Sequence, residues 1–331
     1  MGGTASLGPR GRTQRRAAWV GLGSLSGHVP GTAATATPDQ GLGPTRSNNP
    51  FSNLRRSVSE LLCRRYGLLG SWVTPLTASE LCALIAYAVS SETSLVVGNH
   101  NLHSMYLFHH DGVMRAFCED ADAIIIDGMP LVYVGRLLGL PLLRAQRTTS
   151  LDWLPEVMGQ AATGGWKVFL LGGEQQAVDK AADVLRHRYP GAEIRGHHGY
   201  FDWGPGANEG ERVLHTINDF GPDLLLVGMG MPRQEKWLLD HRKALRAGVK
   251  MNVGALFDYL SGNVPMPPRW LGPLGLEWAY RLLTTPRRVV RRYLIEPWGL
   301  LPIVFHWLRQ GSGASGGPTD RGPESNQPMT S

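Results

Sequence analysis

Short apolar runs recur through the middle of this chain, and a stretch of helical length separates most of them from the next. The runs at 94–97, 123–126, 167–171, 192–195, 223–227 and 249–253 predict strands. Amphipathic stretches at 102–117, 130–138, 176–188, 209–218 and 232–247 predict helices between them. Apolar strands that alternate with helices are typical of a parallel sheet covered by helices on both faces. The predicted fold class is therefore α/β.

The two ends of the chain differ in composition from its middle. Residues 1–50 contain ten Gly and five Pro and no helical or alternating apolar pattern, which predicts a disordered extension. A Gly-, Pro- and Ser-rich tail at 311–331 is predicted to be disordered as well. We expect an α/β domain over 51–265 and a basic helical appendage over 266–310.

The net charge of +6 is concentrated at the ends. Residues 1–50 carry five Arg and one Asp, and residues 266–310 carry seven Arg and two Glu, whereas residues 51–265 sum to about −2. This distribution argues against a protein coated in basic patches and favours an anionic partner at the C-terminal segment. No recognised nucleic-acid module accompanies the basic segment, so we expect no nucleic-acid partner.

Two further features bear on location. A membrane span needs roughly 18 to 20 uninterrupted apolar residues, and the best stretches, 123–143 and 293–307, are both broken by charged residues. The three cysteines, Cys63, Cys82 and Cys118, fit neither a disulfide framework nor a clustered zinc site. We therefore expect a protein of the reducing cytoplasm without a transmembrane helix.

Polar side chains follow two of the predicted strands, where a parallel sheet binds its ligands. Asn99 and Asn101 follow the first strand, and their amides could hydrogen-bond a sugar or a base. Asp127 follows a fully apolar strand, where loss of solvent would raise its pKa and suit it to general-base work. An equally good interpretation is that Asp127 caps the helix that follows.

Glycines follow two other strands. Gly172 and Gly173 end one strand, and Gly228 and Gly230 follow another, where backbone N–H groups could approach a phosphate at a helix N-terminus. Neither set completes the dinucleotide fingerprint, so an NAD-dependent oxidoreductase has only weak support. A tight turn between strand and helix explains the glycines equally well.

Metal-binding patterns are weak. Asp120 and Asp122 match the Asp-x-Asp by which many sugar-nucleotide transferases hold a metal, but they precede a strand, so a solvated loop with a local cap is the preferred interpretation. The histidine pairs 109–110 and 197–198 lack further ligands at zinc-like spacing. We therefore expect neither a metal nor another cofactor.

The C-terminal segment is rich in arginine and aromatic residues. Six arginines fall within 24 residues, namely Arg269, Arg281, Arg287, Arg288, Arg291 and Arg292. If 287–295 is helical, the last four share one face. Arginine forks suit diphosphates and lipid head groups, although a solvated basic helix is the alternative.

Six sequence blocks together resemble the WecG/TagA/CpsF glycosyltransferases. They are ADAIIIDGMPLV (121–132), FLLGG (169–173), HHGYF (197–201), PDLLLVGMGMPRQEKW (222–237), NVGALFDYLSG (252–262) and LGLEWAYRLLTTPRRVVRRYL (274–294). The resemblance implies a Rossmann-like fold and metal-independent, inverting transfer of a sugar. In the best-known members the donor is UDP-N-acetylmannosamine and the acceptor is polyprenyl-diphosphate-linked N-acetylglucosamine. It also implies that the basic appendage engages the inner face of the cell membrane.

The resemblance extends to individual positions. Asp127 matches the proposed catalytic base, and Asn101 matches the asparagine of a Thr-x-Asn motif whose threonine position is Asn99 here. The remaining matches are Gln234 and Glu235 in a Pro-x-Gln-Glu block and Arg281, Arg287, Arg288 and Arg292 in the appendage. One departure is Met266-Pro267-Pro268 in place of the family's Arg-Ala-Pro. Together with Asn99, it leaves donor and acceptor identity open.

The function that we predict is transfer of a sugar, N-acetylmannosamine or a related hexose, from a UDP-sugar to a polyprenyl-diphosphate-linked saccharide in cell-envelope or extracellular polysaccharide synthesis. Its expected location is the cytoplasm, peripherally attached to the membrane. A homo-oligomer is left open. The alternatives are an NAD-dependent oxidoreductase and a family member that has kept the fold without turnover.

Overall fold

A computed structural model of the chain describes residues 58–309 except 205 and 269. The extension predicted at 1–50, the tail predicted at 311–331 and Arg269 lie outside these residues. Where the chain is described, no helix is long and apolar enough to cross a membrane.

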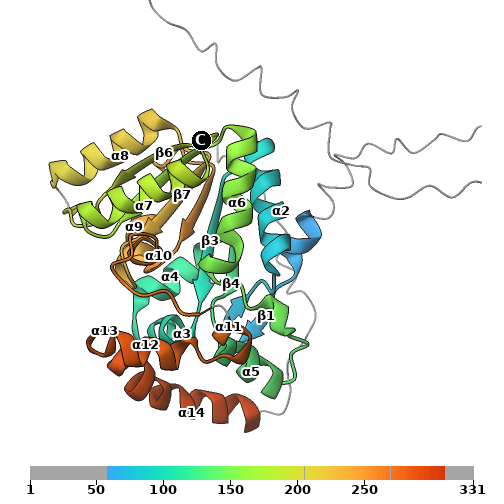
Figure 1. Cartoon of the computed structure of the whole chain (residues 1–331). Helices are drawn as coiled ribbons and strands as arrows, with labels where there is room; N and C mark the ends of the chain where they lie inside the picture. Colours follow the sequence, from blue (N-terminus) through green and yellow to red (C-terminus); the bar gives the residue numbers. More distant parts are fainter. Residues whose placement is uncertain (1–57, 205, 269, 310–331) are drawn as a thin grey trace, which may run out of the picture. The chain divides into compact units, whose positions relative to one another are not determined.

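A six-stranded parallel sheet forms the centre of the described chain (Figure 1). Its strands lie in the order β4 (Ala123–Ile126), β3 (Leu95–His100), β8 (Val249–Asn252), β7 (Leu224–Gly228), β5 (Lys167–Gly172) and β6 (Glu193–His197). Every neighbouring pair is parallel. The predicted α/β class, Rossmann-like with helices on both faces, is therefore confirmed.

Two apolar layers cover the two faces of the sheet, because successive strand residues point to opposite sides. On β7, Leu224 and Leu226 join one core cluster, while Leu225 and Val227 join the other. The first cluster includes residues of α2 (Ala78–Ser90), α6 (Ser150–Gly164) and α7 (Gln175–Arg188). The second includes residues of α4 (Gly112–Asp120), α8 (Asn208–Phe220) and α9 (Arg233–His241).

Several helices differ from the prediction. The helix expected at 102–117 is two helices, α3 (Leu102–His110) and α4, because the carboxylate of Asp111 accepts hydrogen bonds from the N–H groups of Val113 and Met114 and starts a new helix. The prediction also lacked α2, α6 and the small hairpin of β1 (Tyr66–Leu68) and β2 (Ser71–Val73). The remaining elements of the α/β domain are α5 (Met129–Leu137), the short helix η2 (Arg144–Gln146) and α10 (Leu256–Leu260).

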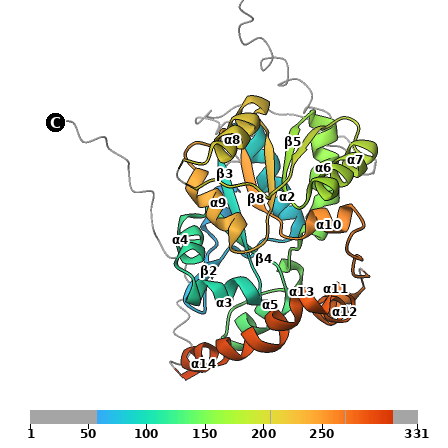
Figure 2. The same ribbon diagram turned by 90° about the vertical axis from the view of Figure 1, so that its left-hand side faces the viewer.

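The appendage is helical and lies at the end of the sheet where β3 and β4 lead into α3 and α5 (Figures 1 and 2). Its elements are α11 (Leu271–Leu274), α12 (Glu277–Thr284), α13 (Pro286–Val290), the π-helical segment η3 (Arg291–Ile295) and α14 (Glu296–Arg309). Leu300 of α14 is buried against α3 and α5, in a third apolar cluster. The single helix considered at 287–295 is thus α13 followed by a wider turn.

Candidate active site

Asp127 follows β4 at the carboxyl end of the sheet. Its N–H donates to the carbonyl oxygen of His100, which ties the end of β4 to the end of β3. The N-cap residue of α5 is Gly128, which has no side-chain cap bond, so Asp127 does not cap this helix. The Asp127 carboxylate is left to face the site.

Asn101 holds its amide towards this carboxylate. Its Oδ1 accepts the N–H of Ser104 at 3.0 Å and so caps α3, which leaves Nδ2 to face Asp127 Oδ2 at 3.5 Å. A cap that uses the oxygen fixes which end of the amide points into the site. The structure therefore brings together Asn101 and Asp127, two of the predicted site residues.

The surroundings of Asp127 raise the pKa of its carboxyl group. Burial raises the pKa of Asp127 to about 6, and Glu277 acts in the same direction, while Arg281 and Arg147 oppose them. A carboxylate with a pKa near 6 is ionised at neutral pH yet basic enough to accept a proton in a reaction.

The appendage supplies a cation near this carboxylate. Arg281 of α12 lies near Asp127, and its Nε is buried with no hydrogen-bond partner among the described residues. Its guanidinium lies 5.4 Å from the centre of the Tyr259 ring. One turn earlier on α12, Glu277 accepts a hydrogen bond from Arg147 at 3.0 Å. This ion pair joins the appendage to the loop before α6.

The structure describes two of the other three predicted arginine side chains. Arg287 is exposed, and the placement of the Arg288 side chain lies outside the described residues. Arg292 is partly buried and acts to lower the pKa of Glu235, so its charge reaches the site. Among the arginine side chains that the structure describes here, Arg281 and Arg292 are brought into the site and Arg287 is not.

A second contact holds the appendage against the domain. His103 of α3 and Glu296, at the start of α14, lie 2.6 Å apart, and the carboxylate side chain is 6% exposed. Burial and the nearby Arg292 lower the pKa of His103, while Glu296 acts in the opposite direction. The pair is thus a buried polar contact, which is destabilising to break.

Four polar side chains form a hydrogen-bonded chain beside Asn101. Asn99 Nδ2 donates to the main-chain oxygen of Asn252 at 2.9 Å and to its Oδ1 at 3.2 Å. Asn252 Nδ2 donates to Glu235 Oε1 at 2.6 Å, and Gln234 Nε2 donates to the same oxygen at 2.7 Å. Gln234 and Glu235 have no solvent exposure. We call Asn99, Asn252, Glu235 and Gln234 the amide relay.

Asn252 was not among the predicted site residues, although the rule that ligands bind at the carboxyl ends of parallel strands would have found it. Asn252 is a polar residue at the end of an apolar strand, like Asn99, but the predicted strand ran through 253 and so hid it. Arg147 and Glu277 were also missed, since no motif marks a residue that meets its partner only through the tertiary fold.

Gly172 and Gly173 serve mainly to pack strands. A side chain at Gly172 would collide with the backbone of Gly228, and Gly172 has a φ of +144°. The N–H of Gly173 donates to the Gly228 oxygen at 3.1 Å. That N–H is already bonded, so a phosphate would have to use other groups, and a ligand-binding role for these glycines remains a prediction.

Asp120 and Asp122 lie at the opposite edge of the sheet. Arg242 donates to both carboxylates, and Asp122 Oδ2 also accepts the N–H of Val96 at 2.7 Å. Their partners make them structural groups. Within the described residues, no group of three or more His, Cys, Asp or Glu side chains could hold a metal ion.

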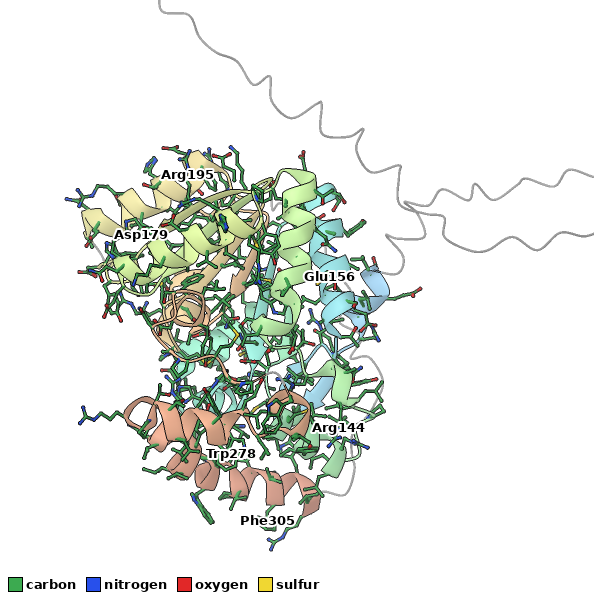
Figure 3. The ribbon with its side chains drawn as sticks, viewed as in Figure 1. Arg144, Glu156, Asp179, Arg195, Trp278 and Phe305 are labelled. Carbon is green, nitrogen blue, oxygen red and sulfur yellow. The ribbon has the colours of Figure 1, made fainter. Side chains whose placement is uncertain are left out.

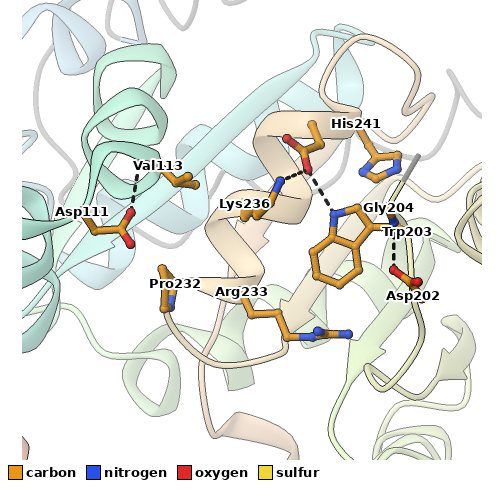
Figure 4. A pocket seen from close by; sticks show the side chains of 10 residues that line it. Asp111, Val113, Asp202, Trp203, Gly204, Pro232, Arg233, Lys236 and His241 are labelled. Carbon is orange, nitrogen blue, oxygen red and sulfur yellow. Dashed lines mark hydrogen bonds and ion pairs between the residues drawn. The ribbon is translucent and has the colours of Figure 1, made fainter. Parts of the chain in front are cut away.

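An open hollow of about 900 Å³ lies between α4, α9 and the loop after β6 (Figure 4). The guanidinium carbon of Arg233 lies 4.3 Å from the centre of the Trp203 ring, and the guanidinium donates to the carbonyl oxygens of Gly199 and Phe201. Across the hollow rim, Trp203 Nε1 donates to Asp240 at 3.1 Å. All of these polar groups already have hydrogen-bond partners within the protein, so they do not mark the hollow as a site for a polar ligand.

Fold and site together define a class. The chain is an α/β protein with a parallel sheet, and at the carboxyl end of that sheet a carboxylate with a raised pKa lies beside arginines from a C-terminal helical appendage. Residues 66–313 match the glycosyl transferase WecG/TagA/CpsF family. The match covers well over half of the chain, so the protein belongs to this family.

Relatives from Staphylococcus aureus point the same way. Proteins of strains NCTC 8325 / PS 47 and MRSA252 are each 34% identical to this chain over 173 residues. Both are named N-acetylglucosaminyldiphosphoundecaprenol N-acetyl-beta-D-mannosaminyltransferase. Each match covers 52% of this chain and 65% of the relative, so the similarity spans just under two thirds of the relatives' length.

Proposed function

We propose that this protein is a glycosyltransferase that moves a sugar from a UDP-sugar to a hydroxyl of a polyprenyl-diphosphate-linked saccharide. The observation that carries the proposal is the position of Asp127, at the end of β4, within the electrostatic influence of Arg281 from the appendage. Membership of the family and the names of the relatives support the same substrates. N-acetylmannosamine, as in those names, is the first sugar to test.

The mechanism that we propose follows from the charges in the site. Asp127 accepts the proton of the acceptor hydroxyl while the oxygen of that hydroxyl forms a bond to the anomeric carbon of the donor sugar. The bond from that carbon to the nucleotide diphosphate breaks on the opposite face, which inverts the configuration. The departing diphosphate takes the electron pair, and the cations of Arg281 and Arg292 stabilise its charge.

The appendage has a second proposed role at the membrane. Its outer surface exposes large apolar side chains, with Leu283 83%, Trp298 71%, Ile295 62% and Phe305 58% exposed. Figure 3 shows Phe305 on the outer side of α14. Exposed cations such as Arg287 and Arg291 accompany them. Apolar anchors flanked by arginines suit the headgroup region of an anionic bilayer, where a polyprenyl-linked acceptor resides. We therefore propose peripheral attachment to the inner face of the cell membrane.

A transfer assay tests the enzymatic proposal. Purified protein is mixed with UDP-N-acetylmannosamine and a synthetic polyprenyl-diphosphate N-acetylglucosamine, and the disaccharide product is measured. Asp127→Asn should keep the fold and lower kcat by about 10²- to 10⁴-fold, the usual contribution of a general base. Asp179→Asn, at an exposed carboxylate of α7, is the matched control and should leave kcat unchanged.

Two outcomes would overturn the proposal. Near-normal turnover by Asp127→Asn would remove that residue as the base. Absence of transfer by the wild-type protein across a panel of UDP-sugars would instead favour a family member without turnover. A parallel reaction with a chelator tests metal independence, since loss of activity there would contradict the metal-free mechanism.

A further inference from the structure

Unpartnered polar atoms gather at one place in this molecule. Six buried side-chain nitrogen or oxygen atoms lack a hydrogen-bond partner among the described residues. Four of them belong to the site, namely Asn99 Oδ1, Gln234 Oε1, Glu235 Oε2 and Arg281 Nε. Folded proteins satisfy most of their buried polar atoms, so such a concentration needs an explanation. A ligand that supplies the missing partners is the simplest one.

One main-chain carbonyl fixes the orientation of two amides of the relay, those of Asn99 and Asn252. The oxygen of Asn252 can only accept, so the amide group of Asn99 that faces it at 2.9 Å must be the nitrogen. The same nitrogen faces Asn252 Oδ1, which turns Asn252 Nδ2 towards Glu235 Oε1. By elimination, the carbonyl oxygen of Asn99 is the end of its amide that is free for a ligand.

Glu235 closes the other end of the relay. Its Oε1 accepts from both Asn252 and Gln234, as an oxygen of a carboxylate or the carbonyl oxygen of a neutral carboxylic acid does. Complete burial raises the pKa of Glu235 to about 7, although the two hydrogen bonds and the Arg292 cation oppose the shift. In the neutral form, Oε2 carries the proton. The thiol of Cys118 on α4 also interacts with this carboxyl group, and burial and Glu235 both raise the pKa of the thiol.

We propose that Asn252 and Glu235 are positioning residues, which hold the amides of Asn99 and Gln234 so that both present a carbonyl oxygen to the sugar of the donor. This inference rests on the proposed function, because it assigns the sugar subsite of that same transferase. Two fixed acceptors select a sugar that offers hydroxyl or amide N–H donors at those positions. An acetamido hexose has both kinds of donor. The residues act through the relay and take no part in bond making.

Binding measurements on the full chain separate the sugar from the nucleotide. The dissociation constants of UDP-N-acetylmannosamine and of UDP are measured by calorimetry for wild type, Asn252→Ala and Asn99→Ala. We expect each variant to bind the UDP-sugar at least tenfold more weakly and to bind UDP within twofold of wild type, because the relay faces the sugar alone. Asn99 is only partly buried, so its variant remains informative if Asn252→Ala does not fold.

Glu235→Gln provides a readout that a merely structural role would not change. Ionisation of Glu235 above pH 7 places a buried negative charge beside an anionic donor, so wild type should bind UDP-N-acetylmannosamine about tenfold more weakly at pH 8.5 than at pH 6.5. Glutamine keeps the shape and the acceptor but cannot ionise. The variant should therefore bind at pH 6.5 like wild type and lose most of the decline at pH 8.5.

The outcomes distinguish the two proposals. If wild type binds UDP-sugars but the relay variants bind them equally well, or lose UDP and UDP-sugar to the same extent, the positioning role is wrong and the transferase proposal stands. If Glu235→Gln declines with pH as wild type does, Glu235 is not a neutral acid in this site. If wild type binds neither UDP nor any UDP-sugar of the panel, the transferase proposal and the relay both fall.

Discussion

Buried polar side chains have different surroundings at the two edges of the parallel sheet, the amino edge where its strands begin and the carboxyl edge where they end. At the amino edge, Asp120 and Asp122 share Arg242, and the almost fully buried Lys250 donates to Ser94 Oγ at 2.6 Å and to the carbonyl oxygen of Ala247 at 2.8 Å. At the carboxyl edge, four buried polar atoms have no partner among the described residues.

The difference separates two uses of a buried polar group. A group whose hydrogen bonds are complete contributes to stability, and its loss leaves a partner unsatisfied. A group held in place with one atom unsatisfied costs stability and is retained where a ligand uses that atom. The amino edge should therefore respond to substitution in unfolding experiments and the carboxyl edge in binding and rate measurements.

After Asp127 itself, the largest effect is expected at Arg281. Arg281→Met removes the cation beside Asp127 and should lower kcat by about 10²- to 10³-fold, the range for loss of one electrostatic stabiliser. Because Arg281 lowers the pKa of Asp127, its removal should raise that pKa above about 6 and shift the acidic limb of the rate profile to higher pH. Transfer rates measured from pH 5 to 8 check both effects. Arg212→Ala on the exposed surface of α8 is the control, and an unshifted limb would contradict the pairing.

A smaller effect is expected on the outer surface of the appendage. Trp298→Ala deletes the most exposed aromatic side chain of α14 and should weaken binding to vesicles of phosphatidylglycerol and phosphatidylcholine by about tenfold, on the scale of one aromatic side chain removed from a membrane interface. Vesicle flotation measures the bound fraction. Tyr200→Ala, a 69% exposed aromatic far from the appendage in sequence, is the control. Equal flotation of all three proteins would place the membrane contact elsewhere.

The smallest effect is expected at the amino edge. Arg242→Ala leaves Asp120 and Asp122 without their cation, and because these side chains are partly exposed we expect a loss of only about 1 kcal/mol in the free energy of unfolding. Turnover with the UDP-sugar should stay at the wild-type value. Urea unfolding and the transfer assay together check this result. A fall in kcat without a loss of stability would break the distinction between the edges.

The sequence was sufficient for those parts of the fold that depend on local pattern. Alternating apolar strands and helices predicted the parallel sheet, and the strand-end rule placed Asn99, Asn101 and Asp127 at one edge. The break at Asp111 was missed because an N-cap within an amphipathic stretch does not interrupt its apolar period. The capping box of Thr77 and Glu80 would have revealed α2.

The site itself could be predicted only in part. Glu277 meets Arg147 across 130 residues, and Asn99 meets Asn252 across 153, and neither meeting follows from spacing along the chain. The second depends on strand order, which places β8 beside β3 although they are the last and the first strands of the sheet, and the first depends on how the appendage packs on the domain. The arginines of the appendage were assigned to one helical face, but the π-helical turn at 291–295 changes the direction of the side chains along it.

The distance along the chain between Asp127 and Arg281 also has a consequence for how the protein is made. A chain grows from its N-terminus, and domains fold as they are completed. The last strand of the sheet ends at Asn252, and Asp127 lies before it in the chain. Arg281 and Glu296, the partner of His103, follow later. A nascent chain can therefore fold the proposed base and the proposed sugar subsite well before it has Arg281, the cation proposed to act in transfer. Arg281 is thus synthesised after the other proposed site residues of the sheet, together with the segment proposed to touch the membrane.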